Sequence, residues 1–237
     1  MMLPNYWWSP WELLAIPGIL VGLWAQFKLQ AAYSKYLQVV ARSGLTGADA
    51  AREILDRAGL KNVPVEEIPG QLTDHYDPMK KALFLSSENF HGRSLSAVGV
   101  AAHEAGHALQ QQASYALFKL RMIIAPATQI ASYGAVFITM FGFFLGAAFF
   151  HPMINIAIGI FSVITFFQLV TLPVEYDASR RAKQQLVQLG IVQMDESPAI
   201  NKVLDAAALT YVAALLAAFL QLLKFIMIAN SMRDNRR

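Results

Sequence analysis

The sequence predicts a mainly α-helical membrane protein, with about four transmembrane helices and a small α+β domain at the membrane surface. Hydrophobic residues make up 56% of the 237 residues, and charged residues make up only 15%. Soluble domains carry about a quarter charged residues, so this composition is typical of a membrane protein. Two polar segments with mixed helix and strand patterns account for the small domain.

The net charge and the absence of cysteine limit which partners the chain can bind and which residues can hold a metal. A formal net charge of +3 on so apolar a chain does not indicate nucleic-acid binding, and we expect none. The sequence has no cysteine, which excludes disulfides and thiolate metal sites. A metal site in this chain must therefore use histidine, aspartate or glutamate ligands.

The first span is predicted at about 11–27. It begins at a tryptophan cluster, Trp7, Trp8 and Trp11, which is typical of a membrane interface. The stretch between the nearest charged residues is short for a crossing, so a buried core helix is the alternative. The N-terminus lacks the basic segment of a cleavable signal peptide, so we expect this span to be retained.

The polar segment that follows predicts two helices. Residues 45–60 have an amphipathic pattern, with Thr46 and Asp49 as a capping box and Gly59 as the stop. Ser94 is placed to cap a second helix that runs through LSAVGVAAHEAGHALQQQ. Between these helices, VPVEEI and KALFLS are typical of short strands, joined by the turn-rich loop PGQLTDHYDPMK.

The central part of the chain predicts a helical hairpin. No Asp, Glu, Lys or Arg occurs from Met122 to Val174. One crossing needs about 20 apolar residues, so this stretch holds two crossings and a turn. We place the turn at His151 and Pro152, with helices on either side at 123–150 and 153–172.

One polar helix and a last span are predicted after the hairpin. Pro173 suits the first turn of a helix that ends at Gly190. Ser197 and Pro198 begin the last helix in the same way, and its apolar part covers about 206–229. Lys224 is the only charged residue in that part, and we expect its side chain to extend to the interface.

Five segments follow from this order of elements. They are an N-terminal membrane span (1–33), a polar segment that contains HEAGH (34–120), a transmembrane hairpin (121–172), a polar helix that contains Glu175 (173–202), and a C-terminal span with a basic tail (203–237). Lysine and arginine are concentrated in the two polar segments, which the positive-inside rule therefore places in the cytoplasm. The tail MRDNRR argues for the opposite, because four spans would place its arginines outside.

The stretch AAHEAGHALQ places His103 and His107 four residues apart, with Glu104 beside the first. Residues at i and i+4 share one face of a helix, so both imidazoles can reach one ion. Glu104 lies beside that position and suits a general base that acts on zinc-activated water. The alternative is a chance HExxH, but these side chains would be costly to bury unpaired among small apolar residues.

A catalytic zinc site uses three protein ligands and one open position, and Glu175 is the best third ligand. Two crossings return the chain to the side that it left, so Glu175 and His107 are expected on the same membrane face. The alternative role of Glu175 is to complement a helix dipole. Asp177 could orient a ligand histidine or pair with Arg181, and Ser179 shares the face of Glu175.

A developing oxyanion needs a hydrogen-bond donor besides the metal. His75 and Tyr76 in TDHYDP, and Tyr176 beside Glu175, are the candidates. We predict His75 and Tyr176 as catalytic residues together with Glu104. The alternative for His75 is a surface or structural role.

LTDHYDP, GVAAHEAGHA and LPVEYDASRRA, in this order and around a helical hairpin, resemble the YugP-type bacterial membrane neutral zinc metallopeptidases. The resemblance covers about residues 11–232, and more distantly it extends to HtpX-like and CAAX-processing membrane proteases. It implies a zincin-like catalytic domain with Zn²⁺ held by His103, His107 and Glu175. It also implies that Glu104 is the catalytic glutamate.

Two positions depart from the wider gluzincin pattern. That pattern places an aspartate four residues after the ligand glutamate, where this chain has Ser179. It also often supplies a histidine after the glutamate ligand, but no histidine follows His151 here. The orienting carboxylate would then come from Asp177, and the oxyanion donor from a tyrosine, an arginine or His75.

Two functions fit these observations. The first is a multi-pass zinc metalloendopeptidase of the bacterial cell membrane, which hydrolyses peptide bonds of membrane or membrane-associated proteins with its site facing the cytoplasm. Arg93 and Arg180 flank the ligand segments, which favours a site near the interface over one at bilayer depth. KALFLS would be an edge strand that holds an extended peptide.

The second function is a membrane scaffold or quality-control adaptor with a structural zinc. A structural site would need a fourth protein ligand, and the sequence offers no convincing one. The lipid bilayer and a peptide or membrane-protein substrate are the expected partners. An oligomer or a regulatory membrane partner is left open.

Overall fold

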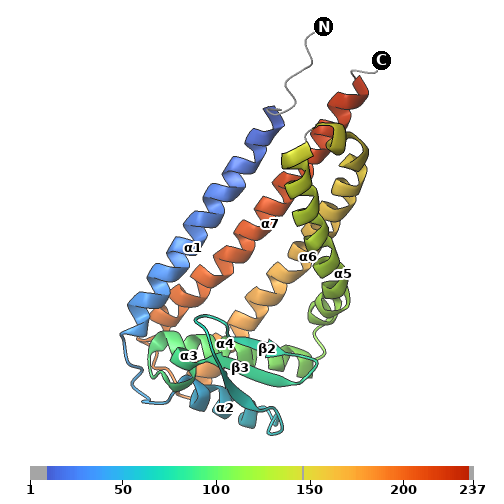
Figure 1. The fold of residues 1–237 in the computed structure, drawn as a ribbon. Coiled ribbons are helices and arrows are strands. Elements are labelled where there is room, and N and C mark those ends of the chain that lie inside the picture. The colour runs from blue at the N-terminus through green and yellow to red at the C-terminus, as the bar shows by residue number, and fades with distance from the viewer. Residues whose placement is uncertain (1–9, 146, 235–237) are drawn as a thin grey trace. The chain divides into compact units, whose positions relative to one another are not determined.

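The structure is a computed structural model that describes residues 10–145 and 147–234. The chain forms two compact units, whose elements are drawn in Figure 1. The helical unit comprises 1–24, 120–172 and 211–237, and the mixed unit comprises 25–119 and 173–210. The five predicted segments are a finer division than these two units and stay a prediction. Trp7 and Trp8 of the predicted interfacial cluster lie outside the described residues.

Four long helices confirm the prediction of a mainly α-helical membrane protein. Each contains a stretch that is long and apolar enough to cross a membrane. A short 3₁₀ helix, η1 (Pro10–Leu14), precedes the first of them. The four helices are α1 (Ala15–Leu37), α5 (Ala116–Leu145), α6 (Ala147–Gln188) and α7 (Ser197–Asp234).

Two predicted helix boundaries are wrong. The hairpin does not turn at His151 and Pro152, because α5 ends at Leu145 and both residues lie inside α6. Pro173 does not begin a new helix either, since α6 continues through it to Gln188. A proline removes one N–H donor from a helix. Membrane helices tolerate this loss, because neighbouring groups and small local adjustments satisfy the freed carbonyl.

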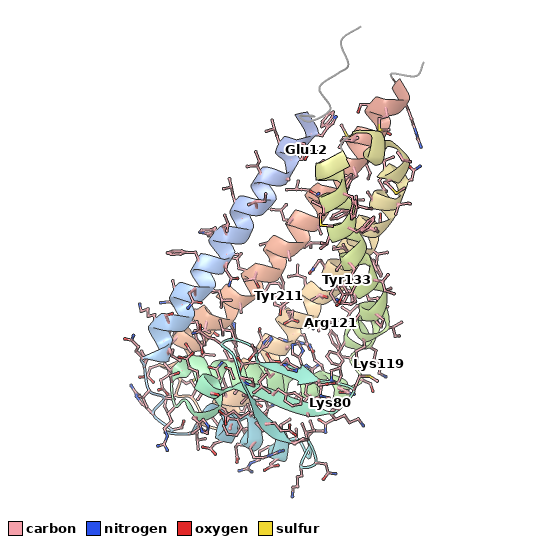
Figure 2. The ribbon with its side chains drawn as sticks, viewed as in Figure 1. Glu12, Lys80, Lys119, Arg121, Tyr133 and Tyr211 are labelled. Carbon is pink, nitrogen blue, oxygen red and sulfur yellow. The ribbon has the colours of Figure 1, made fainter. Side chains whose placement is uncertain are left out.

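In the helical unit, α1 and α7 approach each other at two points. A side chain at Gly18 would come within 3.0 Å of the Ala217 Cα atom, so glycine permits the close packing there. Lys224 Nζ lies 3.1 Å from Glu12 Oε2, and Glu12 is labelled in Figure 2. Lys224 is therefore buried and paired with Glu12, and its predicted extension to the membrane interface stays a prediction. A buried charge needs such a partner, because desolvation without one is costly.

The mixed unit is built from short elements around a three-stranded sheet. Its helices are α2 (Gly47–Arg57), α3 (Ser87–His91) and α4 (Leu95–Gln112), and its strands are β1 (Val65–Ile68), β2 (His75–Asp77) and β3 (Ala82–Ser86). The strand order is β1-β3-β2, with β1 parallel and β2 antiparallel to β3. Figure 1 shows these elements.

The prediction that KALFLS forms an edge strand is wrong. β3 lies between the two other strands, and all five of its residues are buried. A continuous apolar run is typical of a strand that is covered on both faces, whereas an exposed edge usually alternates. β2, which lies in the predicted loop, is one of the two edges instead. A strand of three residues is too short to show an alternation of apolar and polar residues in the sequence.

The predicted helix caps of the mixed unit are confirmed. Thr46 Oγ1 accepts from the Asp49 backbone N–H, and the Asp49 carboxylate accepts from the Thr46 N–H, each over 3.1 Å. Gly59 has the positive φ of +77° that suits a helix stop. Ser94 Oγ accepts from the Ala97 N–H over 3.1 Å at the start of α4. These caps fix α2 and α4 around one apolar core, with β3 and the end of α6.

Candidate metal centre

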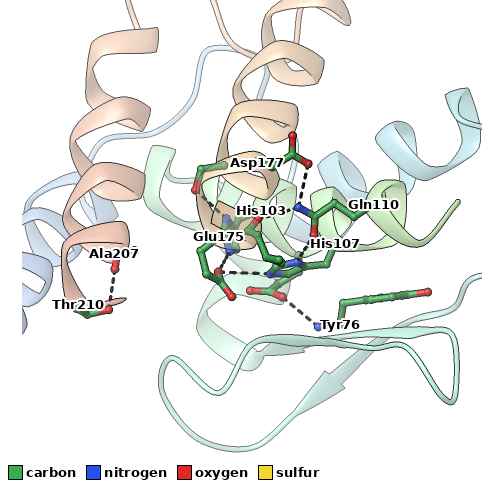
Figure 3. Close-up of polar contacts among 11 residues, drawn as sticks. Tyr76, His103, His107, Gln110, Glu175, Asp177, Ala207 and Thr210 are labelled. Carbon is green, nitrogen blue, oxygen red and sulfur yellow. Dashed lines mark hydrogen bonds and ion pairs between the residues drawn. The ribbon is translucent and has the colours of Figure 1, made fainter. Parts of the chain in front are cut away.

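Two helices of the mixed unit bring three metal-binding side chains together. α4 supplies His103 and His107, and the last part of α6 supplies Glu175. Glu175 Oε2 lies 3.1 Å from His103 Nε2 and 3.5 Å from His107 Nε2. Figure 3 draws the three side chains together. One donor atom from each residue lies within 4.8 Å of the other two. The three predicted ligands therefore form one compact group.

Gly106 allows the two helices to come this close. A Cβ atom at this position would lie 2.6 Å from the Ala178 carbonyl oxygen, well inside van der Waals contact. Only glycine lets the α4 backbone pack directly on the α6 backbone at this point. The contact occurs one residue from His107 and three from Glu175, so it sets the separation of the ligands.

The donor set fits a zinc ion. Two imidazole nitrogens and one carboxylate oxygen are ligands that catalytic zinc uses, with a fourth position open. Glu175 is only 1% exposed, and its carboxylate lies against the imidazoles of both histidines. Among the side chains that the structure describes, no further histidine, aspartate or glutamate joins the group.

A second layer of hydrogen bonds surrounds the histidines. Ser179 Oγ lies 3.1 Å from His103 Nδ1, and Gln110 Oε1 lies 2.9 Å from His107 Nδ1. The Gln110 amide nitrogen donates to Asp177 Oδ2 over 3.0 Å. Both Nδ1 atoms are thus occupied within the protein, while both Nε2 atoms face Glu175.

Of the two alternatives for Asp177, the structure contains the pair with Arg181. Its carboxylate accepts from Arg181 Nε over 2.6 Å and also pairs with Arg180. It reaches the ligand His107 only indirectly, through Gln110. Sequence reasoning missed Gln110, although a polar residue three positions after His107 on one helix face was an available signal.

Glu104 is a residue of α4, next to His103 in the sequence, and its side chain is 8% exposed. Its Oε2 atom accepts a hydrogen bond from the Tyr76 backbone N–H over 3.0 Å (Figure 3). Burial raises the pKa of Glu104 to about 7, although the nearby His103 acts in the opposite direction. A carboxyl group with a pKa near neutrality can both take up and release a proton.

The other predicted catalytic residues occupy more open positions. His75 is exposed at the start of β2, where Nδ1 lies 2.9 Å from the Thr73 carbonyl and the ring stacks on Phe84. Tyr176 is 49% exposed on α6. In the TDHYDP segment it is Tyr76 that contacts Glu104, and the Tyr76 hydroxyl donates to Gln111 Oε1 over 2.6 Å. The roles of His75 and Tyr176 as oxyanion donors stay predictions.

The fold and the site define a class: a helical membrane protein with a group of two histidines and one glutamate, in which His107 and Glu175 are buried. Residues 11–230 match the family described as "Putative neutral zinc metallopeptidase", and the chain belongs to this family. It is also 48% identical over 221 residues to the "Putative membrane protease YugP" of Bacillus subtilis (strain 168). That match covers 93% of this chain and 97% of the relative. No solved structure matches the chain.

Proposed function

We propose that this protein is a membrane-anchored zinc metalloendopeptidase that hydrolyses peptide bonds of membrane or membrane-associated proteins. The observation that carries the proposal is the convergence of His103, His107 and Glu175 beside the buried Glu104. Membership of a neutral zinc metallopeptidase family supports it, as does the name of the relative, a membrane protease.

In this proposal the chain holds zinc through Nε2 of His103, Nε2 of His107 and a carboxylate oxygen of Glu175. Bound zinc would supply Lewis-acid activation of the water and of the scissile carbonyl. A structural zinc in a scaffold protein would need a fourth protein ligand, and the described residues add none to the group. The three-ligand set therefore favours the enzyme over the scaffold.

Glu104 is the proposed general base and acid. It takes a proton from the attacking water as the new C–O bond forms, and it returns that proton to the amine nitrogen as the C–N bond breaks. Burial raises the pKa of Glu104 in the zinc-free protein, which favours the uptake of a proton by its carboxylate. The Tyr76 N–H holds one carboxylate oxygen of Glu104 and so limits the directions in which the carboxylate can turn.

We propose a cytoplasmic site, because lysine and arginine are concentrated in the polar segments that carry Glu104 and Glu175. The bilayer is a partner of the chain through its four candidate spans. The substrate class follows from the anchoring, since a protease fixed in a bilayer encounters chains in or on that bilayer.

The test separates metal binding from chemistry. Glu104→Gln should keep the wild-type zinc content and lose about 10²–10⁴-fold in peptide cleavage by the purified protein. His103→Ala, His107→Ala and Glu175→Ala should each lower zinc stoichiometry, measured by elemental analysis. Glu66→Gln, an exposed glutamate of β1, is the matched control and should change neither quantity.

Two results would contradict the proposal. Zinc-dependent function that persists in Glu104→Gln would exclude the enzyme, and full zinc occupancy in Glu175→Ala would remove Glu175 from the site. Comparing the proteomes of cells that carry wild-type protein or Glu104→Gln would then identify substrates as membrane proteins that accumulate with the variant.

A further inference from the structure

We propose that Gln110 is a positioning residue for His107. Its side-chain amide holds His107 in the tautomer that carries the proton on Nδ1 and leaves the Nε2 lone pair free for a metal. The inference rests on the proposed zinc site. In it, the buried Gln110 side chain fixes the tautomer of one proposed zinc ligand, His107.

The orientation of the Gln110 amide follows from its neighbours on α6. One end of the amide lies 2.7 Å from the Val174 carbonyl oxygen and 3.0 Å from Asp177 Oδ2. A backbone carbonyl can only accept a hydrogen bond, and so can a carboxylate that is paired with two arginines. The amide nitrogen must therefore face α6, because an oxygen there would meet two other acceptors.

This orientation fixes the tautomer of His107. With its nitrogen committed to α6, Gln110 presents Oε1 to His107 Nδ1 at 2.9 Å. An amide oxygen cannot donate, so His107 Nδ1 must carry the proton of this hydrogen bond. A neutral imidazole has a single N–H, and its Nε2 atom is therefore unprotonated. That atom faces Glu175 Oε2 at 3.5 Å.

Burial makes the arrangement costly to reverse. Gln110 has no exposed surface, so no solvent can satisfy an amide that turns over. Leaving a buried donor or acceptor unpaired costs about 1–3 kcal/mol. His103 lacks such a constraint, because its neighbour Ser179 has a hydroxyl that can either donate or accept. The two ligand histidines thus differ in how firmly their tautomers are set.

The experiment reads the tautomer directly in zinc-free protein. Protein with ¹⁵N-labelled histidine, purified in detergent, is examined by long-range ¹H–¹⁵N NMR, and His107→Ala assigns the signal among five histidines. Wild-type His107 should carry its proton on Nδ1, whereas Gln110→Met should shift population toward the Nε2–H form. Zinc affinity, measured by competition with a chelator, should fall about 10–100-fold in Gln110→Met.

Two further variants separate positioning from space filling. Gln110→Glu keeps an acceptor for Nδ1–H and should keep the tautomer, although it places a carboxyl group beside Asp177. A residue that only filled space would show the reverse, with methionine tolerated and glutamate not. Gln112→Met makes the same change on the same helix, where the side chain bonds to the Ala58 carbonyl, and should alter neither tautomer nor affinity.

An Nε2–H tautomer in the wild-type protein would overturn the proposal without any variant. An unchanged tautomer and zinc affinity in Gln110→Met would also overturn it. Neither measurement involves peptide cleavage, so an inactive protein would contradict the proposed peptidase while leaving this inference intact. Conversely, loss of cleavage in Glu104→Gln says nothing about the His107 tautomer.

Discussion

At the scale of single residues, the site depends on burial as much as on ligand identity. Glu104 and Glu175 are both removed from solvent, yet their surroundings differ. Glu175 lies against two imidazoles, whereas Glu104 accepts one backbone hydrogen bond and burial raises its pKa to about 7. One carboxylate is thus suited to bind a cation and the other to exchange protons.

The raised pKa of Glu104 predicts a pH-dependent stability of zinc-free protein. The folded state holds the Glu104 proton more tightly than the unfolded state, whose pKa is near 4.5. The corresponding stability is therefore fully present below about pH 4.5 and is lost as the pH rises through about 7. Glu104→Gln is neutral throughout, so its advantage in unfolding free energy over wild type should grow by about 3 kcal/mol between these limits.

Thermal unfolding in the presence of a chelator, from pH 5 to pH 8, measures this difference. The gap between the two midpoints should widen as the pH rises to about 7 and then level off. A gap that stays constant across the range would show that Glu104 titrates as it does in the unfolded chain.

The sequence identifies the site residues that share a helix turn better than those that meet across the fold. The spacing of His103 and His107, and the return of the chain at Glu175, predicted that these three side chains lie close together, as they do in the structure. Their role as zinc ligands stays a prediction. Gln110 lies three residues after His107, so helix spacing indicates their contact. Its bonds to Val174 and Asp177 could not be predicted in this way, because these residues lie 64 and 67 residues further along the chain. Such a contact depends on how two helices pack, which periodicity does not encode.

At the scale of elements, the packing of α4 on α6 controls the geometry of the donor group. A Cβ atom at Gly106 would collide with the Ala178 backbone, which cannot move aside as a flexible side chain can. The distance between the two helices is thus set by a residue that binds nothing.

Gly106→Ala should therefore weaken zinc binding without altering any ligand. We expect a loss of at least about tenfold in zinc affinity, because separating the helices moves Glu175 away from both histidines. Gly99→Ala is the matched control on the same helix. A Cβ atom there would meet Ile200 at 3.4 Å, an ordinary contact, and alanine favours a helix by about 1 kcal/mol over glycine.

Chelator competition and the unfolding midpoint, measured on both variants, decide between the outcomes. Wild-type zinc affinity in Gly106→Ala would show that the helices can separate without cost to the site. Weakened affinity in Gly99→Ala would show instead that any added bulk on α4 disturbs the metal centre.

The capped helices were predicted correctly from the sequence, whereas two helix boundaries at prolines and the short strand β2 were not. Helices with side-chain caps, such as those begun by Thr46 and Ser94, carry local signals that the structure confirms. Proline gave a false signal at Pro152 and Pro173, because its cost is lower in long membrane helices than in soluble ones. The strand β2 has three residues and owes its pairing to β3, so no local pattern marks it.

At the scale of the whole molecule, composition alone predicted most of the architecture. Four apolar helices follow from long stretches with few charges, and the structure contains them. The orientation of these helices across a membrane is a different matter, since it depends on the distribution of lysine and arginine. The polar segments and the C-terminal tail give opposite indications.

A cysteine-labelling experiment should place the mixed unit in the cytoplasm. The chain has no cysteine of its own, so a single introduced thiol gives an unambiguous signal. Lys61→Cys, at an exposed position, should react with a membrane-impermeant maleimide only after cells are opened. Ser9→Cys, before the first span, should react in intact cells. The opposite pattern would invert the orientation.

The separation of the metal ligands along the chain also has a consequence in time. His103 and Glu175 are 72 residues apart, and the uncharged hairpin lies between them. A ribosome adds about 5–20 residues per second, so Glu175 is synthesised about 4–14 s after His103. Throughout that interval the nascent chain has two of its three donors and no means to complete the group. The proposed zinc site of each new copy is therefore incomplete until the hairpin has been synthesised, and the proposed peptidase chemistry cannot begin before Glu175 has been added.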